Sequence, residues 1–144
     1  MNQNLRQARA SDAAAMHRVR MSVHENRLVS IQLTERDYQV AIEQTGRGWV
    51  VEQDGAIVAF AIGDVTDGSI WALFVEPGHE AKGYGRELHD VMVAWLWQQG
   101  HEQLSLTTEP GTRAERFYEK AGWQRAGITD RGEVRFELSR GELR

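Results

Sequence analysis

Apolar residues repeat every three or four positions in two segments of the first third of the chain, which predicts two amphipathic helices. The apolar set of the first segment is Ala15, Met16, Val19 and Val23. Ser11 directly precedes this segment, and we expect its hydroxyl to cap the helix. Thr34 followed by Asp37 resembles a capping box and predicts a second helix that ends near Gly46. Residues 4–9, ahead of the first helix, are compatible with a short strand.

Runs rich in β-forming residues dominate the middle of the chain. Two of them fill residues 48–64 and are joined through Asp54-Gly55, a dipeptide typical of tight hairpins. Asp67-Gly68 then turns the chain into a third run over residues 69–75. Together the three runs predict an antiparallel meander.

The most regular helical pattern begins directly after a pair of glycines. Its apolar stripe consists of Leu88, Val91, Met92, Trp95 and Leu96, and Gly100 marks its end. The remaining segments predict a strand over 103–108, a short helix over 112–122, and a closing pair of strands over 123–128 and 133–138. This order predicts one α/β (α+β) domain over residues 1–144, built on a mixed sheet with a right-handed parallel crossover from 70 to 107.

The composition is that of a folded protein without a strong electrostatic preference. Hydrophobic residues make up 41% of the 144 residues and charged residues 26%, and 17 basic against 21 acidic residues give a formal net charge of −4. Nothing at the level of the whole chain therefore attracts nucleic acid or an anionic membrane. No apolar run approaches the roughly 18 residues of a membrane span, and the first residues contain no apolar signal segment. We expect a cytoplasmic protein.

Metal and thiol chemistry find no support in the sequence. The chain contains no cysteine, which excludes disulfides, thiolate metal sites and a cysteine nucleophile. Its histidines show no metal-ligand spacing. We therefore expect no metal site.

Gly83 and Gly85 stand between the end of a predicted strand and the first turn of the predicted long helix. Unpaired N–H groups and the positive end of the helix dipole form an anion site at such a position. Without Cβ atoms the chain can curl around phosphate oxygens, and Lys82 and Arg86 add positive charge. A diphosphate would fit here, although a turn that merely needs a positive φ would use the same glycines.

Two well-known phosphate loops do not match this stretch. A Walker loop requires Lys after its second glycine, whereas Tyr84 follows Gly83. A dinucleotide fingerprint requires a third small residue where Leu88 stands.

The stretch resembles the coenzyme A loop of the GNAT superfamily of N-acetyltransferases, whose pattern is Val-x-Pro followed by Gln/Arg-x-x-Gly-x-Gly/Ala at the start of a long helix. The residues in register with that pattern are Val75, Pro77, Gly83 and Gly85. The residues that match the second motif of the family, further along the chain, are Ala114, Phe117, Tyr118, Gly122 and Trp123. The resemblance covers nearly all 144 residues.

The resemblance implies a GNAT-like fold, with a mixed, mostly antiparallel central sheet flanked by helices and a V-shaped splay between strands 4 and 5. It implies direct transfer of acetyl from acetyl-CoA to a primary amine within a ternary complex. The thioester carbonyl would be held by a backbone N–H near Phe74 or Val75. The cofactor-binding residues would be Phe74, Val75, Glu80, Ala81, Lys82, Gly83, Tyr84, Gly85, Arg86, Gly111 and Tyr118.

The family position of the catalytic acid for the departing thiolate is Tyr118. With reference pKa values of about 10 for Tyr and 8.5 for a thiol, full proton donation is uphill by about 2 kcal/mol, so Tyr118 assists the reaction without driving it. A tyrosine that only packs beside Phe117 is the alternative. No motif identifies the general base. His24 and Glu25 are the first candidates, and Glu109 and Asp64 are further ones. For each of the four, a solvated surface position is the more ordinary interpretation.

Two positions depart from the family pattern. Glu80 replaces the Gln/Arg that could help to hold a diphosphate, so backbone N–H groups should dominate there. Gly111 replaces a common Asn, so its contact is absent or comes from Thr108 or Thr112. These departures keep a non-catalytic acyl-CoA-binding sensor open as an alternative, and a Rossmann-type nucleotide protein is a third interpretation. A phosphate-binding role for Arg113 is also open.

The acceptor amine is not identified by the sequence. Short flanks favour a small-molecule amine, while a protein amine and a homodimer are both compatible with the chain. Trp71 is a candidate for touching substrate, but strand alternation predicts that Trp71 and Phe74 lie on opposite faces, so that at most one of them can do so.

Overall fold

Strands and helices are intermixed along the computed structural model, which describes residues 4–23 and 32–142. The strands are β1 (Leu5–Gln7), β2 (Gly46–Gln53), β3 (Ala56–Asp64), β4 (Ser69–Val75), β5 (Gln103–Thr108), β6 (Gln124–Ile128) and β7 (Val134–Ser139). The α-helices are α1 (Ala13–Ser22), α3 (Glu35–Glu43), α4 (Tyr84–Gln98) and α5 (Arg113–Lys120), and short 3-10 turns are η1 (Ala10–Asp12), η3 (Glu80–Lys82) and η4 (Arg140–Glu142). The predicted order of elements is confirmed.

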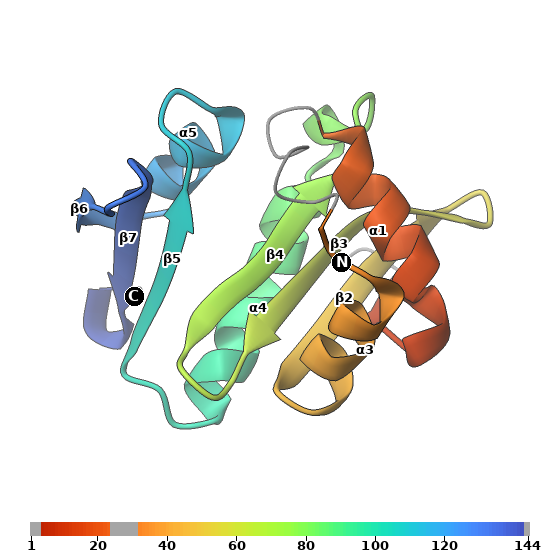
Figure 1. Ribbon diagram of the computed structural model, residues 1–144, viewed down its shortest axis with the longest axis horizontal. Coiled ribbons are helices and arrows are strands. Elements are labelled where there is room, and N and C mark those ends of the chain that lie inside the picture. Colours follow the sequence, from red (N-terminus) through yellow and green to blue (C-terminus); the bar gives the residue numbers. More distant parts are fainter. Residues whose placement is uncertain (1–3, 24–31, 143–144) are drawn as a thin grey trace.

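All seven strands form one sheet in the order β1-β2-β3-β4-β5-β7-β6 (Figure 1). Neighbouring strands are antiparallel except β4 and β5, which are parallel. The pairing of β4 with β5 is confined to Ser69 and Ser105, after which the two strands diverge. The sheet is therefore mixed and mostly antiparallel, with the predicted splay between its fourth and fifth strands.

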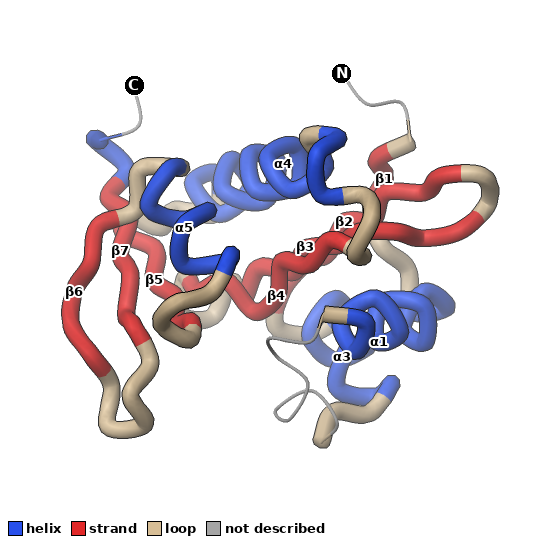
Figure 2. The backbone as a smooth tube through the Cα atoms, turned by 90° about the horizontal axis from the view of Figure 1, so that it is seen from above, coloured by secondary structure: helices blue, strands red, loops and turns tan. Residues whose placement is uncertain are grey.

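Helices cover both faces of the sheet (Figure 2). α4 and α5 lie on one face, over a core that includes Leu88, Met92 and Leu138. α1 and α3 lie on the other face, over a second core that includes Tyr38 and Phe60. Across residues 4–23 and 32–142, no helix has both the length and the apolar character to cross a bilayer.

The predicted cap of the first helix is wrong, whereas that of the second is confirmed. The chain enters α1 through η1, and Asp12, not Ser11, organises this entry. The Asp12 carboxylate accepts the Arg9 backbone N–H at 2.7 Å and pairs with Arg6 of β1 at 2.8 Å. This ion pair with the preceding strand engages Asp12 rather than the adjacent Ser11 hydroxyl. At α3 the capping box of Thr34 and its acidic partner three residues later forms as predicted.

A β-bulge in β4 overturns the prediction that Trp71 and Phe74 lie on opposite faces. Ile62 pairs with Ala72 and Gly63 with Ile70, so Trp71 has no partner on β3. A bulge shifts the alternation of side chains by one residue. Both aromatic rings consequently pack on the α1/α3 face, where the Arg20 guanidinium lies 5.4 Å from the Trp71 ring and 4.8 Å from the Phe74 ring. Both rings are thus on the same side of β4.

Candidate active site

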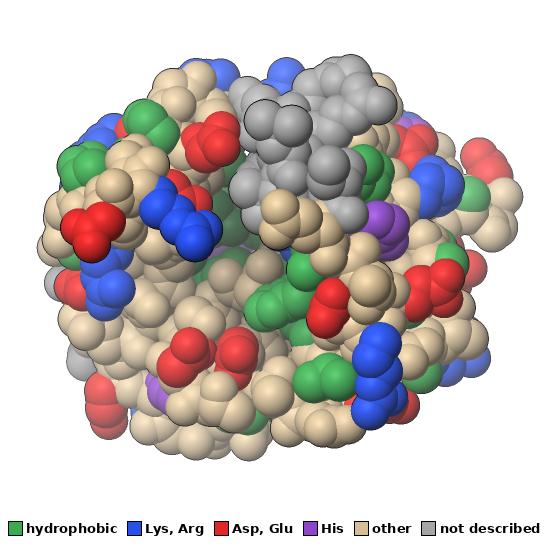
Figure 3. Space-filling model, viewed as in Figure 1, with side chains coloured by type: hydrophobic (Ala, Val, Ile, Leu, Met, Phe, Trp, Pro, Cys, Tyr) green, Lys and Arg blue, Asp and Glu red, His purple; other side chains and the backbone are tan. Residues whose placement is uncertain are grey.

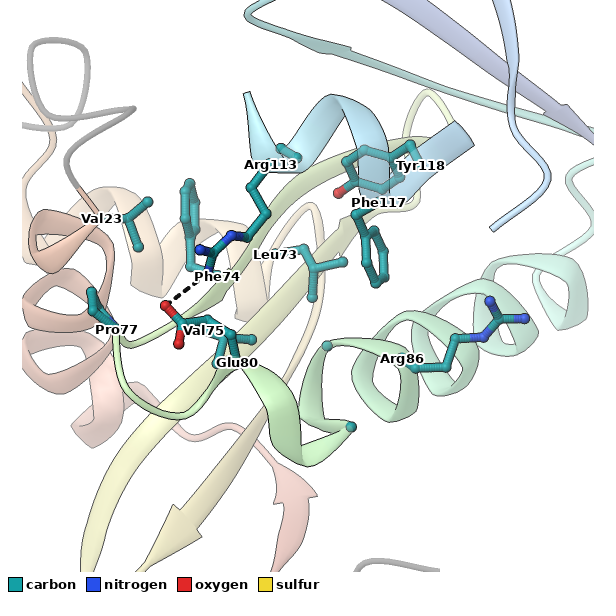
Figure 4. A pocket seen from close by; sticks show the side chains of 13 residues that line it. Val23, Leu73, Phe74, Val75, Pro77, Glu80, Arg86, Arg113, Phe117 and Tyr118 are labelled. Carbon is teal, nitrogen blue, oxygen red and sulfur yellow. Dashed lines mark ion pairs between the residues drawn. The ribbon is translucent and has the colours of Figure 1, made fainter. Parts of the chain in front are cut away.

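A cavity of about 420 Å³ opens where β4 and β5 diverge. Its lining comes from the end of α1, from β4 and the loop after it, from the start of α4, and from α5: Val23, Leu73, Phe74, Val75, Pro77, Glu80, Gly83, Gly85, Arg86, Arg113, Ala114, Phe117 and Tyr118 (Figure 4). Figure 3 shows the molecule hollowed between α5 and β4, with hydrophobic side chains inside the hollow. The cleft is mainly apolar, and its charged side chains gather near the glycine loop.

The backbone of β4 offers hydrogen-bonding groups to this cleft. The Glu76 N–H donates to Val58 O of β3 at 2.8 Å. The backbone N–H and C=O groups of successive residues in a strand point in opposite directions. Those of Phe74 therefore also point toward β3, whereas those of Leu73 and Val75 point away from β3, into the splay. An extended ligand could pair with this edge as an added strand. Of the two predicted backbone donors, Val75 has the suitable direction, and Phe74 contributes its ring instead.

The two glycines leave the start of α4 open toward the cleft. Gly83 has φ 82°, and a Cβ built on it would meet nothing within 4 Å, so conformation is what requires glycine there. A Cβ on Gly85 would lie 3.6 Å from both Phe117 and Val75. Gly85 therefore keeps the passage between these two side chains open. Both glycines line the cavity.

Seven of the predicted cofactor-binding residues are brought together around the cavity: Phe74, Val75, Glu80, Gly83, Gly85, Arg86 and Tyr118. Lys82 and Tyr84 direct their side chains elsewhere, to the β2–β3 hairpin. Gln53 Oε1 lies 3.2 Å from the Lys82 ammonium nitrogen and accepts the Tyr84 hydroxyl at 2.8 Å. Ala81 is exposed and outside the lining. Gln53 was not among the predicted residues, because it lies on a hairpin about 30 residues earlier in the chain.

The β5–α5 turn does not line the cavity. The Gly111 N–H donates to Glu115 Oε1 at 2.6 Å, and Gly111 has φ 77°, so this glycine shapes the turn. The Thr112 hydroxyl donates to Glu109 O at 2.7 Å and accepts the Glu115 N–H at 3.2 Å, capping α5. The hydroxyl of Thr112 is therefore already engaged by the turn. Its role is to fix the start of the helix that carries Tyr118.

Tyr118 lies on α5 with its hydroxyl directed into the cavity (Figure 4). Its side chain is 5% exposed and packs edge-on against Phe117 at 5.3 Å and Trp123 at 5.5 Å between ring centroids. Burial raises the pKa of the Tyr118 hydroxyl above its ordinary value. The hydroxyl thus keeps its proton at neutral pH.

One ion pair spans the cleft. Arg113 Nη1 of α5 lies 2.8 Å from Glu80 Oε2 of η3. Glu80 Oε1 also accepts the Gly78 N–H at 2.9 Å. Backbone N–H groups of Glu80 itself and Gly78, together with the Arg113 guanidinium, lower the pKa of the Glu80 carboxyl.

Of the four predicted candidates for the general base, the structure describes two. His24 and Glu25 lie outside the described residues and stay predictions. Glu109 is exposed on the β5–α5 turn, outside the cavity lining. Asp64 pairs with Ser69, at the end of β4 opposite the cleft, and its carboxylate accepts the Thr66 N–H at 2.9 Å. Among the described lining residues Glu80 is the only carboxylate, and the described part of the chain contains no cluster of three metal-ligating side chains.

A buried histidine behind the cleft was not identified from the sequence. His89 of α4 is 1% exposed; its Nε2 accepts the Trp123 indole N–H at 2.9 Å, and its Nδ1 lies 2.9 Å from Asp90 Oδ1. Its ring meets that of Phe117 at 5.7 Å, so it supports a wall of the cavity. Burial lowers the pKa of His89. The available signal was its position three residues before Met92 and seven before Leu96, which places this polar residue beside the apolar stripe.

Acidification should destabilise the protein through His89. Its pKa is lower in the folded than in the unfolded state, so the unfolded chain binds the proton first as pH falls through about 6.5. The stabilisation is complete above that pH and declines below it, by up to about 1.4 kcal/mol per pH unit. Urea unfolding at pH 7.5, 6.5 and 5.5 should show that the free energy of unfolding falls more steeply with decreasing pH for the wild type than for His89→Gln, which has no imidazole to titrate. Equal pH slopes for the two proteins would contradict this.

Comparisons with known proteins were consistent with one another. Residues 8–123 match the family model described as the acetyltransferase (GNAT) family. The chain is 33% identical over 81 residues to a mycothiol acetyltransferase of Beutenbergia cavernae, an alignment that covers 52% of this chain and 27% of that relative. The chain thus aligns with only about a quarter of the length of this curated relative.

Solved structures share the fold. The PaiA N-acetyltransferase from Thermoplasma acidophilum, in complex with coenzyme A, superposes with a TM-score of 0.81 at 13% identity, covering 94% of this chain and 97% of that chain. The ribosomal-protein-S18-alanine N-acetyltransferase from Escherichia coli superposes with a TM-score of 0.75 at 19% identity, covering 94% and 92%.

Proposed function

The chain belongs to the acetyltransferase (GNAT) family, and we propose that it transfers an acetyl group from acetyl-CoA to a primary amine by direct attack within a ternary complex. The observation that carries the proposal is the combination in one cleft of an open β4 edge, a glycine-lined helix start and the Tyr118 hydroxyl. These three features suit a ligand with a long uncharged arm and an anionic end.

The cleft residues fit such a ligand in their chemistry. N–H groups at the start of α4, opened by Gly83 and Gly85 and flanked by Arg86, would hold the diphosphate. Backbone groups of Leu73 and Val75 would pair with the pantetheine arm. Bound acetyl-CoA would supply the activated thioester.

The protein's own groups would then stabilise the charge on the thioester oxygen and supply a proton to the departing sulfur. A backbone N–H from the free edge of β4 would donate to the thioester oxygen, a contribution commonly worth a few kcal/mol. Tyr118 would hold a proton at its hydroxyl and donate a hydrogen bond to the sulfur. Because burial raises the pKa of Tyr118, transfer of this proton would be coupled to the breaking of the C–S bond.

The acceptor must lose a proton before it can attack. An alkyl ammonium with a pKa near 10.4 costs about 4.6 kcal/mol to deprotonate at pH 7. Glu109 and Asp64 lie outside the cavity lining, so His24 and Glu25 stay the first candidates for the base. Glu80, which lines the cavity, is engaged by Arg113. We keep a small-molecule amine as the acceptor. A protein amine is the alternative, as the name of the ribosomal-protein-S18-alanine N-acetyltransferase illustrates.

A cytoplasmic location stays part of the proposal, as does the lack of nucleic-acid and membrane partners. The formal net charge of −4 offers no attraction to nucleic acid or to an anionic membrane. A homodimer is compatible with the chain. The second candidate function is a non-catalytic acyl-CoA sensor, which the carboxylate of Glu80 beside the glycine loop favours.

Ligand-induced stabilisation tests the proposal. Coenzyme A at about 100 times its dissociation constant should add about 2.7 kcal/mol and raise the melting temperature by about 10 °C, whereas NAD and ATP should have little effect. Thiol release from acetyl-CoA should then appear with at least one member of a panel of amines. Stabilisation by NAD or ATP alone would support the nucleotide protein, and coenzyme A binding without turnover across broad panels would support the sensor.

A further inference from the structure

The ion pair between Glu80 and Arg113 joins the two sides of the cleft. Glu80 belongs to η3, which follows β4, and Arg113 is the first residue of α5, which follows β5. Both side chains line the cavity, and their contact crosses it at 2.8 Å (Figure 4). Any ligand that extends from the glycine loop along β4 must therefore approach this pair closely.

Glu80 is the fixed partner. Its carboxylate accepts the Gly78 N–H at 2.9 Å in addition to the contact with Arg113. Backbone N–H groups and a guanidinium are the same kinds of donor that bind a phosphate oxygen. The Glu80 carboxylate thus acts as an internal anion three residues before Gly83.

Arg113 is the more exposed partner. Its side chain is 64% exposed, against 35% for Glu80. As the first residue of α5 it lies at the positive end of a helix dipole, which does not favour a cation. Exposed ion pairs contribute little to stability, so a change of partner would cost the fold little.

We propose that Arg113 is a cofactor-binding residue that exchanges the Glu80 carboxylate for a diphosphate oxygen, and that Glu80 sets the affinity by competing with that diphosphate. The proposal rests on the proposed function, because it requires coenzyme A in this cleft. A diphosphate held at Gly83 and Gly85 would place negative charge beside Glu80. It would repel the Glu80 carboxylate and attract the Arg113 guanidinium. Neutralising Glu80 would remove the repulsion and the ion pair with Arg113 at the same time.

The exchange predicts a dependence on the head group of the ligand. Coenzyme A carries the diphosphate, whereas pantetheine has the same thiol arm and no phosphate. Substitutions at Glu80 and Arg113 should therefore change the affinity for coenzyme A and leave that for pantetheine unchanged. A purely structural role of the pair would alter both ligands alike.

Titration calorimetry of the full chain with coenzyme A and pantetheine at low ionic strength tests this. Glu80→Gln should tighten coenzyme A binding about tenfold, and Arg113→Gln should weaken it about tenfold. In the Arg113→Gln background, Glu80→Gln should gain only about threefold, because the release of Arg113 no longer contributes. Glu80→Asp, which keeps the charge, should not tighten binding. High salt should reduce all these differences.

Matched controls are available on the same elements. Arg116 is an exposed arginine in the same turn of α5, and Glu109 is an exposed glutamate on the turn before it; neither lines the cavity. Arg116→Gln and Glu109→Gln make the same charge changes nearby and should shift the coenzyme A affinity less than twofold. Thermal unfolding should confirm that every variant is folded.

The outcomes separate the two proposals. The exchange is overturned, and the proposed function stands, if the wild type binds coenzyme A but neither Glu80→Gln nor Arg113→Gln changes the affinity for it. The same conclusion follows if the two substitutions change the affinity for pantetheine as strongly as that for coenzyme A. Weaker coenzyme A binding by Glu80→Gln overturns it as well. If neither the wild type nor any variant binds coenzyme A, the proposed function itself fails.

Discussion

Tyr118→Phe should lower kcat about 100-fold while leaving the dissociation constant of coenzyme A within twofold of the wild-type value. The hydroxyl is directed into the cleft and keeps its proton because burial raises its pKa, so its expected contribution is a hydrogen bond to the departing sulfur. The ring itself packs against Phe117, Trp123 and Phe136, and phenylalanine preserves those contacts. Steady-state thiol release and coenzyme A titration measure the two quantities.

Tyr84→Phe is the matched control for this experiment. Tyr84 also belongs to the predicted site, but its hydroxyl donates to Gln53 Oε1 at 2.8 Å, away from the cavity. Its removal should leave kcat within about threefold of the wild type. Wild-type turnover by Tyr118→Phe, or a parallel loss of coenzyme A binding, would remove Tyr118 from the proposed chemistry.

Gly85→Leu should weaken coenzyme A binding more than about 100-fold without unfolding the protein. A Cβ at this position lies 3.6 Å from Phe117 and from Val75, so the additional atoms of leucine would fill the passage between them. The position is helical, and replacing glycine in a helix gains about 1 kcal/mol of intrinsic propensity, so the fold should tolerate the change. Titration with coenzyme A and thermal unfolding measure the two effects separately.

A graded substitution makes this result specific. Gly85→Ala adds only the Cβ, which sits at an ordinary contact distance, and should weaken binding less than about fivefold. Should the leucine variant bind coenzyme A as tightly as the wild type, the passage beside Gly85 would not be the route of the cofactor. Loss of the cooperative unfolding transition would instead point to strain at the start of α4.

Local patterns in the sequence were sufficient for most of the fold. Asp54-Gly55 and Asp67-Gly68 predicted the turns that connect β2, β3 and β4, and the apolar stripe predicted α4. Each of these signals acts between residues close in the chain. Two local predictions failed because of contacts that their patterns did not include. The Asp12 carboxylate, not the Ser11 hydroxyl, is engaged at the start of the first helix because it pairs with Arg6 of the preceding strand, and the register with β3 places Trp71 in a bulge.

The site divides in the same way. The glycine loop, with its left-handed Gly83, and the position of Tyr118 on α5 were readable from the order of residues. The partners of the side chains were not, because Gln53 holds Tyr84, Trp123 holds His89 and Arg113 holds Glu80 across large separations in sequence.

The sequence by itself determined the elements, the family resemblance and the open helix start, because turn chemistry, apolar periodicity and the lack of a Cβ are properties of neighbouring residues. Only the tertiary structure decided which charges meet and which backbone edge stays free. Those outcomes depend on the register of distant strands: β4 pairs with β5 only at Ser69 and Ser105, and the resulting splay both frees the edge of Val75 and sets Glu80 opposite Arg113.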